Sequence, residues 1–330
     1  MTTSGEQPTT LVTGGCGFIG FALCRRLAAA GHQVAAYDDL SRGREENLPV
    51  GARLVQGDIR DPRRLADALS EVRPENVIHL AAIHYLPDCA ARPRETMEVN
   101  VEGTRHVLEA CRAGGVGVRR VVFASTAAVY APVDVPCSED GTPLRPIEVY
   151  GESKLAGERL VEALSRDTAI TATVVRISNA VGRRETNPHV VPHIFESLRR
   201  STQVSLGSLE ARRDYIDTRD IADAILAVLD SSSGYQVFNV GTGVAHSVAD
   251  IVAALRRILG RPIDILQDAS RLRPVERMLL VADIGRIRRG TGWAPRVTFE
   301  ETLSDLVDAY GLRSGASDTD TAHPTRTPAP

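Results

Sequence analysis

The first half of the chain alternates short apolar runs with longer amphipathic segments. Short apolar runs bounded by turn residues are typical of buried strands, and the segments between them have the length and spacing of helices. Strands are predicted at residues 10–13, 33–37, 53–56, 77–81, 120–124 and 172–176. Helices are predicted at 18–30, 62–70, 93–113 and 149–166. This alternation predicts an α/β fold, a Rossmann-type doubly wound parallel sheet with helices on both faces.

After about residue 177, polar and turn-rich stretches separate further helical segments, predicted at 190–200, 219–230, 247–259 and 300–310. We therefore predict a Rossmann domain over 9–177 together with about 214–245. A smaller, irregular α/β substrate-binding domain is predicted over 178–213 and 246–312, covering the sheet edge where such folds bind ligands. The segment 313–330 is rich in Ser, Thr, Ala and Pro, which is typical of a disordered tail.

Composition narrows the class of protein. The chain has 330 residues, 43% of them hydrophobic, and a net charge of -3, which provides no basic surface for nucleic acid. No run approaches the roughly 20 apolar residues that cross a bilayer, and the sequence MTTSGEQPTT does not resemble a signal peptide. The five cysteines are scattered and form no C-x-x-C pair. These features predict a cytoplasmic protein that binds neither membrane nor nucleic acid, and no metal site.

A glycine-rich turn follows the first predicted strand and opens the first predicted helix. Within TGGCGFIG the spaced glycines are Gly14, Gly17 and Gly20. Such a turn lets the backbone approach a pyrophosphate, and the helix N-terminus offers it free N–H groups. Asp38 ends the second strand, where a carboxylate accepts hydrogen bonds from the adenosine ribose and repels a 2′-phosphate. The pattern favours NAD, while Arg42 and Arg44 keep NADP as an alternative.

Tyr150 and Lys154, in the sequence YGESK, share one face of a predicted helix because they are four residues apart. The lysine ammonium and the positive nicotinamide ring would stabilise a phenolate, which gives a general base beside a hydride acceptor. Thr126 ends the fifth predicted strand, where its hydroxyl can hydrogen-bond the reacting hydroxyl of a substrate. Its neighbour Ser125 is the alternative, and we expect one of the two to be structural.

Ten short motifs extend this pattern over residues 9–312. They are TGGCGFIG, YDDLSRG, GDIRD, VIHLAA, NVEGT, ASTAAVY, YGESK, RISNAVG, RRDYID and FNVGTG. In this order they resemble the extended short-chain dehydrogenases of the NAD-dependent epimerase/dehydratase family, in particular the UDP-glucose 4-epimerases and their relatives. Counted back from Tyr130, Thr126 occupies the catalytic Ser/Thr position of that family.

The resemblance implies further contacts. With NAD it implies contacts from Phe18, Ile19, Asp39, Asp58, Ile59, Leu80, Ala81, Ala82 and Asn100. With the nucleotide sugar it implies contacts from His84, Asn179, His189, Val190, Leu206, Arg213, Arg273 and Glu276. Asn179, Arg213 and Arg273 are expected at the diphosphate, since a guanidinium binds phosphate through two parallel N–H groups. Glu276 is expected at the uridine ribose.

Three departures from the family pattern concern the sugar. His84 stands where many epimerases have lysine or a small residue, and it is either a contact to the diphosphate or sugar or a structural histidine. His189 replaces an asparagine of the substrate loop. The R-P-V-E run lacks the usual glycine and aspartate. Leu280, near the expected position of the sugar, favours a hexose or uronic acid without an N-acetyl group.

Ala127 and Ala128 indicate the reaction. Related dehydratases have an Asp-Glu pair there, which exchanges protons during elimination, whereas alanine cannot. The resemblance then implies a nucleotide-sugar 4-epimerase acting on a UDP-hexose or UDP-hexuronate. The alternatives are a 4-ketoreductase or dehydrogenase, a dehydratase, and, remotely, a non-catalytic NAD-binding sensor. Helices 93–113 and 149–166 resemble those that form a four-helix bundle in family dimers, so a homodimer is expected.

Overall fold

Seven parallel strands form the main sheet of the computed structural model, which describes residues 7–113, 117–271 and 277–313. In spatial order they are β10 (Tyr235–Val240), β6 (Thr171–Ile177), β5 (Arg120–Thr126), β4 (Asn76–His79), β1 (Thr9–Thr13), β2 (Gln33–Asp38) and β3 (Arg53–Gln56). The strand order reverses between β1 and β4, which is where open sheets of this kind bind ligands. The predicted doubly wound sheet is confirmed.

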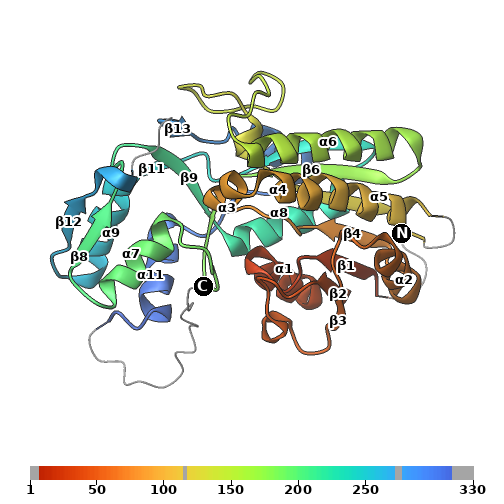
Figure 1. Cartoon of the computed structure of the whole chain (residues 1–330), viewed down its shortest axis with the longest axis horizontal. Coiled ribbons are helices and arrows are strands. Elements are labelled where there is room, and N and C mark those ends of the chain that lie inside the picture. The colour runs from red at the N-terminus through yellow and green to blue at the C-terminus, as the bar shows by residue number, and fades with distance from the viewer. Residues whose placement is uncertain (1–6, 114–116, 272–276, 314–330) are drawn as a thin grey trace.

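Helices cover both faces of this sheet (Figure 1). One face carries α1 (Phe18–Ala29), α8 (Thr218–Ser231) and α10 (Gly285–Thr291), and the other carries α2 (Pro62–Val72), α5 (Thr104–Arg112) and α6 (Val149–Asp167). Because successive strand residues point to opposite faces, Val12 packs with α1 and α8 whereas Leu11 packs with α2 and α5. Two apolar cores therefore enclose the sheet.

The predicted helix at 93–113 is interrupted. It consists of α4 (Pro93–Met97), a π-helical turn at Glu98–Gly103, and α5. In the π-helical turn, Asn100 turns inward and its carbonyl accepts a hydrogen bond from Thr104 Oγ1 at 2.7 Å. The other predicted helices and strands are present, with ends that match or differ by one or two residues, and the seventh strand, β10, was not predicted from the sequence.

A smaller region adjoins the carboxyl edge of the main sheet, on the left of Figure 1. One small sheet holds β7 (Asn179–Val181), β9 (Arg212–Asp217), β11 (Ala245–Ser247) and β13 (Leu279–Leu280), and a second pairs β8 (Gln203–Leu206) with β12 (Asp264–Gln267). Its helices are α7 (Val190–Leu198), α9 (Val248–Leu259) and α11 (Phe299–Ala309). Capping boxes begin α9 at Ser247 and α11 at Thr298, which fixes where both helices start.

Short elements complete the described chain. They are α3 (Leu86–Ala91) and the 3-10 turns Glu45–Asn47, Ala127–Val129 and Ala269–Arg271. No helix among the described residues is both long enough and apolar enough to span a bilayer. The predicted tail, 313–330, lies outside the described residues apart from Arg313.

Candidate active site

A cavity of about 720 Å³ opens where the main sheet meets the smaller region. Its walls come from the carboxyl ends of β1, β2, β4 and β5, from the start of α6, and from α7, β8 and β9. Every predicted site residue that the structure describes lines this cavity, with the exception of Asn100. Arg273 and Glu276 lie outside the described residues. One space therefore brings together the predicted cofactor, catalytic and substrate groups.

The glycine-rich turn forms the cofactor end of the cavity. Gly14 has a φ of +72°, and a Cβ there would lie 2.8 Å from the backbone nitrogen of Ala81. A Cβ on Gly20 would lie 2.5 Å from the carbonyl oxygen of Gly14, so the helix can approach the turn only with glycine. The N-terminus of α1 has no side-chain cap and no acidic residue in its first turn. Its free N–H groups therefore suit an anionic ligand such as a pyrophosphate.

Asp38 ends β2 with its carboxylate held in place. Its oxygens accept hydrogen bonds from Cys16 N at 3.0 Å and from Leu40 N at 2.9 Å, which leaves lone pairs for ribose hydroxyls. Arg42, which would favour a 2′-phosphate, instead pairs with Asp88 at 2.5 Å. Both observations favour NAD over NADP.

The catalytic end is built from the end of β5 and the start of α6. The hydroxyl of Thr126 accepts a hydrogen bond from Ala128 N at 3.2 Å and is also hydrogen-bonded to the phenol of Tyr150. Burial raises the pKa of Tyr150 above its usual value, and the hydrogen bond with Thr126 lowers it in part. Thr126 and Tyr150 are thus two neighbouring hydroxyls on the wall of the cavity.

Lys154 lies one helical turn after Tyr150, with Nζ 4.3 Å from the centroid of the Phe123 ring. Burial lowers the pKa of Lys154 to about 7, and the nearby Glu158 carboxylate opposes this shift. The structure records no hydrogen bond between Lys154 and Tyr150. In the protein without its cofactor, burial sets the direction of the Tyr150 pKa shift, and the lowering of this pKa by the lysine together with the nicotinamide ring stays a prediction.

Ser125 serves a different purpose from its neighbour. Its hydroxyl donates to Glu158 Oε1 at 2.5 Å in the interior, and Glu158 pairs with Arg176 at 2.7 Å. Arg176 Nη1 donates to Tyr130 Oη at 3.0 Å, and this hydroxyl donates to Asn239 Oδ1 at 2.7 Å. Ser125 is therefore structural, which supports the choice of the next residue as the catalytic hydroxyl.

Asn100 lies behind the cavity wall. Its amide oxygen accepts from Ile83 N at 2.8 Å, and its Nδ2 donates to Ile83 O at 2.8 Å and to Ser153 Oγ at 2.9 Å. These bonds link the segment after β4 to α6. Asn100 thus positions the cavity wall, and no described contact brings it to the cofactor space.

Two arginines mark the substrate end. Arg213 on β9 donates to the carbonyl of Arg277 at 2.7 Å. Arg277, which was not predicted from the sequence, donates from Nη2 to the carbonyl of Tyr130 at 2.8 Å. Its Nη1 is buried without a hydrogen-bond partner among the described residues. A buried guanidinium with a free donor is costly unless it meets an acceptor, so Arg277 suits an anionic ligand.

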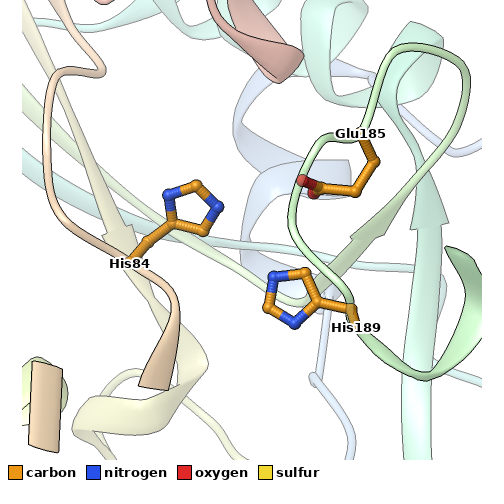
Figure 2. Close-up of side chains that lie close together, drawn as sticks. All are labelled: His84, Glu185 and His189. Carbon is orange, nitrogen blue, oxygen red and sulfur yellow. The ribbon is translucent and has the colours of Figure 1, made fainter. Parts of the chain in front are cut away.

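A cluster of polar side chains lines the same cavity, and Figure 2 shows three of its members, His84, Glu185 and His189. The rings of His84 and His189 are stacked with centroids 5.9 Å apart, and Tyr85 meets His189 edge-on at 5.3 Å. Asn187 Nδ2 lies 3.1 Å from His84 Nε2. Burial lowers the pKa of His84 to about 4 and raises that of Glu185 to about 7. Glu185 and Asn187 were not predicted from the sequence, because they belong to a loop without a motif.

Comparisons with known proteins agree with this geometry. Residues 10–241 match the model of the NAD dependent epimerase/dehydratase family. The UDP-glucose 4-epimerase of Corynebacterium glutamicum is 31% identical, over 93% of this chain and 96% of that protein.

Solved structures agree as well. The UDP-glucose 4-epimerase of Thermus thermophilus, in complex with NAD, superimposes with a TM-score of 0.85 and 31% identity, covering 94% of this chain and 100% of that one. The enzyme of Thermotoga maritima, with UDP-glucose, gives 0.84 and 29%, covering 92% and 98%. The chain therefore belongs to the NAD-dependent epimerase/dehydratase family.

Proposed function

We propose that this protein is an NAD-dependent 4-epimerase of nucleotide sugars, with a UDP-hexose or UDP-hexuronate as substrate. The observation that carries the proposal is the Thr126–Tyr150 hydroxyl pair, which shares one cavity with the glycine-rich turn. The likeness to the UDP-glucose 4-epimerases reported above supports the reaction. Ala127 and Ala128 supply no acid for elimination, which argues against a dehydratase.

The cofactor supplies a reversible hydride acceptor when it is bound. Tyr150 removes the proton of the sugar 4-hydroxyl, and Thr126 orients that hydroxyl and passes the proton. Held at the glycine-rich turn and Asp38, the cofactor would accept the C4 hydride as the proton leaves, which gives a 4-ketone, and would supply it again to the opposite face of C4 once the sugar has turned, while Tyr150 returns the proton. Arg213, Arg277 and Asn179 hold the diphosphate, so that the intermediate stays in place while it turns.

The test is a panel of UDP-, dTDP-, GDP- and CDP-sugars incubated without added cofactor and followed by NMR for inversion at C4. We expect inversion of a UDP-sugar by the wild-type protein. Tyr150→Phe should lower kcat by about 10²- to 10⁴-fold, since a general base is lost. Full activity of Tyr150→Phe would refute the assignment. A strict need for stoichiometric added NADH would instead identify a 4-ketoreductase.

The organisation of the molecule is part of the proposal. The main sheet with β10 holds the cofactor, and the small sheets, including β9, hold the substrate.

The exposed Met97 lies in the helical region 93–113 that is expected at the dimer seam. Light scattering should therefore give twice the chain mass, and a monomer at micromolar concentration would contradict the dimer. The five cysteines, all within described segments, are free and buried, which supports a reducing cytoplasm.

A further inference from the structure

Three side chains of metal-ligand type converge at the substrate end of the cavity. His84 follows β4, whereas Glu185 and His189 lie in the loop between β7 and α7. Their ligand atoms all lie within 4.8 Å of one another. Figure 2 shows a ring nitrogen of each histidine and the carboxylate of Glu185 turned toward a common space.

We propose that His84, Glu185 and His189 form a binding site for one divalent transition-metal ion of the zinc type. Two imidazoles and one carboxylate are a ligand set that zinc accepts, and three protein ligands leave one coordination position open. Two nitrogen ligands favour zinc-like ions over magnesium or calcium, which prefer oxygen. The site shares the cavity with Thr126 and Tyr150, but metal binding does not depend on the reaction proposed above.

The surroundings of the three residues already restrain them. Glu185 Oε1 accepts a hydrogen bond from Asn187 N at 2.7 Å. His84 is hydrogen-bonded to the backbone of Ala82, and such a bond from one ring nitrogen orients the other toward a metal.

The charge of the cluster also favours a cation. Glu185 is buried, and no lysine or arginine in the described parts of the chain forms an ion pair with it. The charge of Arg42 acts on Glu185 less than burial and hydrogen bonds do, and Arg42 itself pairs with Asp88 at 2.5 Å. The charges of Lys154 and Arg42 also act on His84, and a bound ion has to compete with them. A buried carboxylate is commonly compensated by a paired charge or a metal ion. A divalent ion would supply that charge between Glu185 and the two imidazoles.

Binding requires a small closure of the cluster. Bonds of about 2.0–2.2 Å in a tetrahedral site place neighbouring ligand atoms about 3.4 Å apart, closer than the limit of 4.8 Å observed here. His189 ends a loop and caps α7, so side-chain rotation there disturbs no strand. The amide of Asn187, 3.1 Å from His84 Nε2, has to give way to the ion. The open position would then face the cavity that also contains Asn179.

The experiment uses the full chain without an affinity tag and with its bound cofactor, treated with a chelator and then titrated with Co²⁺. We expect one Co²⁺ per chain and visible absorption bands of low-symmetry, nitrogen-ligated Co²⁺, with Zn²⁺ displacing the ion. His84→Ala and His189→Ala should each weaken binding at least about tenfold. His32→Ala is the matched control, because His32 bonds Thr10 Oγ1 at 2.8 Å outside the cavity.

Two results would overturn the proposal. One is the absence of such bands in the wild-type protein, and the other is an unchanged affinity in both cavity-histidine variants while His32→Ala also binds normally. A cooperative melting transition of each metal-free variant shows that the variant is folded. If His84→Ala does not fold, His84→Gln replaces it in the titration. Asn187→Ala should bind Co²⁺ at least as tightly as wild type. Tyr150→Phe should lose epimerase activity while its Co²⁺ affinity is unchanged, which separates this proposal from that of the reaction.

Discussion

At the scale of single residues, the two adjacent hydroxyls at the end of β5 have different environments. Thr126 faces the cavity and contacts Tyr150, whereas Ser125 faces the interior and donates to Glu158. Strand alternation separates them, because successive side chains point to opposite sides of a sheet. The sequence favoured Thr126 over Ser125, and the directions of the two side chains support that choice.

Thr126→Ala should lower kcat by about 10²-fold, since the hydroxyl that orients the reacting proton is lost. Ser125→Ala is the matched control, and its kcat should stay near the wild-type value. Its free energy of unfolding should fall by about 1–2 kcal/mol, because Glu158 loses a buried donor. Steady-state kinetics and urea unfolding measure the two effects. Equal losses of kcat in both variants would contradict the separate roles.

Lys154 makes stability depend on pH. Its pKa is about 7 in the folded protein and about 10.5 in the unfolded chain, so between these values the unfolded chain binds one more proton. The free energy of unfolding should therefore rise with pH across this window, by as much as about 1.4 kcal/mol per unit. As the pH falls toward 7, Lys154 becomes protonated in the folded protein as well, and the stability present at higher pH is lost.

Urea unfolding of cofactor-free protein at pH 7, 8 and 9 measures the effect. Lys154→Met has no titrating group at this position. As the pH rises, the free energy of unfolding of the wild-type protein should therefore increase relative to that of the variant. Parallel pH profiles for the two proteins would show that Lys154 keeps an ordinary pKa.

At the scale of elements, the turn between β1 and α1 depends on backbone contact as well as on backbone conformation. Gly14 and Gly31 both have positive φ, at +72° and +86°. A Cβ would meet the backbone of Ala81 at Gly14, whereas at Gly31 nothing lies within 4 Å. Substitution of Gly31 therefore tests backbone strain alone, whereas substitution of Gly14 adds steric overlap.

Gly31→Ala should lower the free energy of unfolding by about 1–2 kcal/mol through strain alone and leave NAD affinity unchanged. Gly14→Ala should in addition weaken NAD binding at least about tenfold, because β1 and the segment after β4 must move apart. Fluorescence titration of cofactor-free protein with NAD gives the affinities. Similar NAD affinities in the two variants would mean that the contact with Ala81 is unimportant.

Elements with strong periodicity could be predicted from the sequence, and those that depend on distant partners could not. Six strands of the main sheet were found, but β10 carries polar residues, Gln236 and Asn239, within a short run. β13 has two residues and exists because it pairs with β9. The site residues with motifs were placed in the cavity, whereas Glu185, Asn187 and Arg277 reach it through tertiary folding of segments without a motif.

At the scale of the whole molecule, a buried polar network joins the main sheet to the segment after β13. It runs from Glu158 through Arg176 and Tyr130 to Asn239. Asn239 Nδ2 donates to the carbonyls of Cys137 at 2.8 Å and Asp283 at 3.1 Å. The network therefore fixes the substrate end of the cavity relative to the sheet.

Glu158→Gln should lower the free energy of unfolding by about 3–5 kcal/mol, because Arg176 would remain charged and buried without its partner. The double variant Glu158→Gln, Arg176→Met should recover part of this loss, since the uncompensated charge is gone. Urea denaturation of both variants tests this. A double variant less stable than the single one would show that packing, and not charge, sets the loss.

The opposite directions of Ser125 and Thr126 also bear on how such a protein can diversify. The interior hydroxyl belongs to the buried network, and the cavity hydroxyl is the one that the proposed reaction uses. Selection can therefore change the side chain at position 126 without removing the buried hydrogen bond of Ser125. A protein with this arrangement can acquire a new reaction through substitutions that face the cavity at the end of β5.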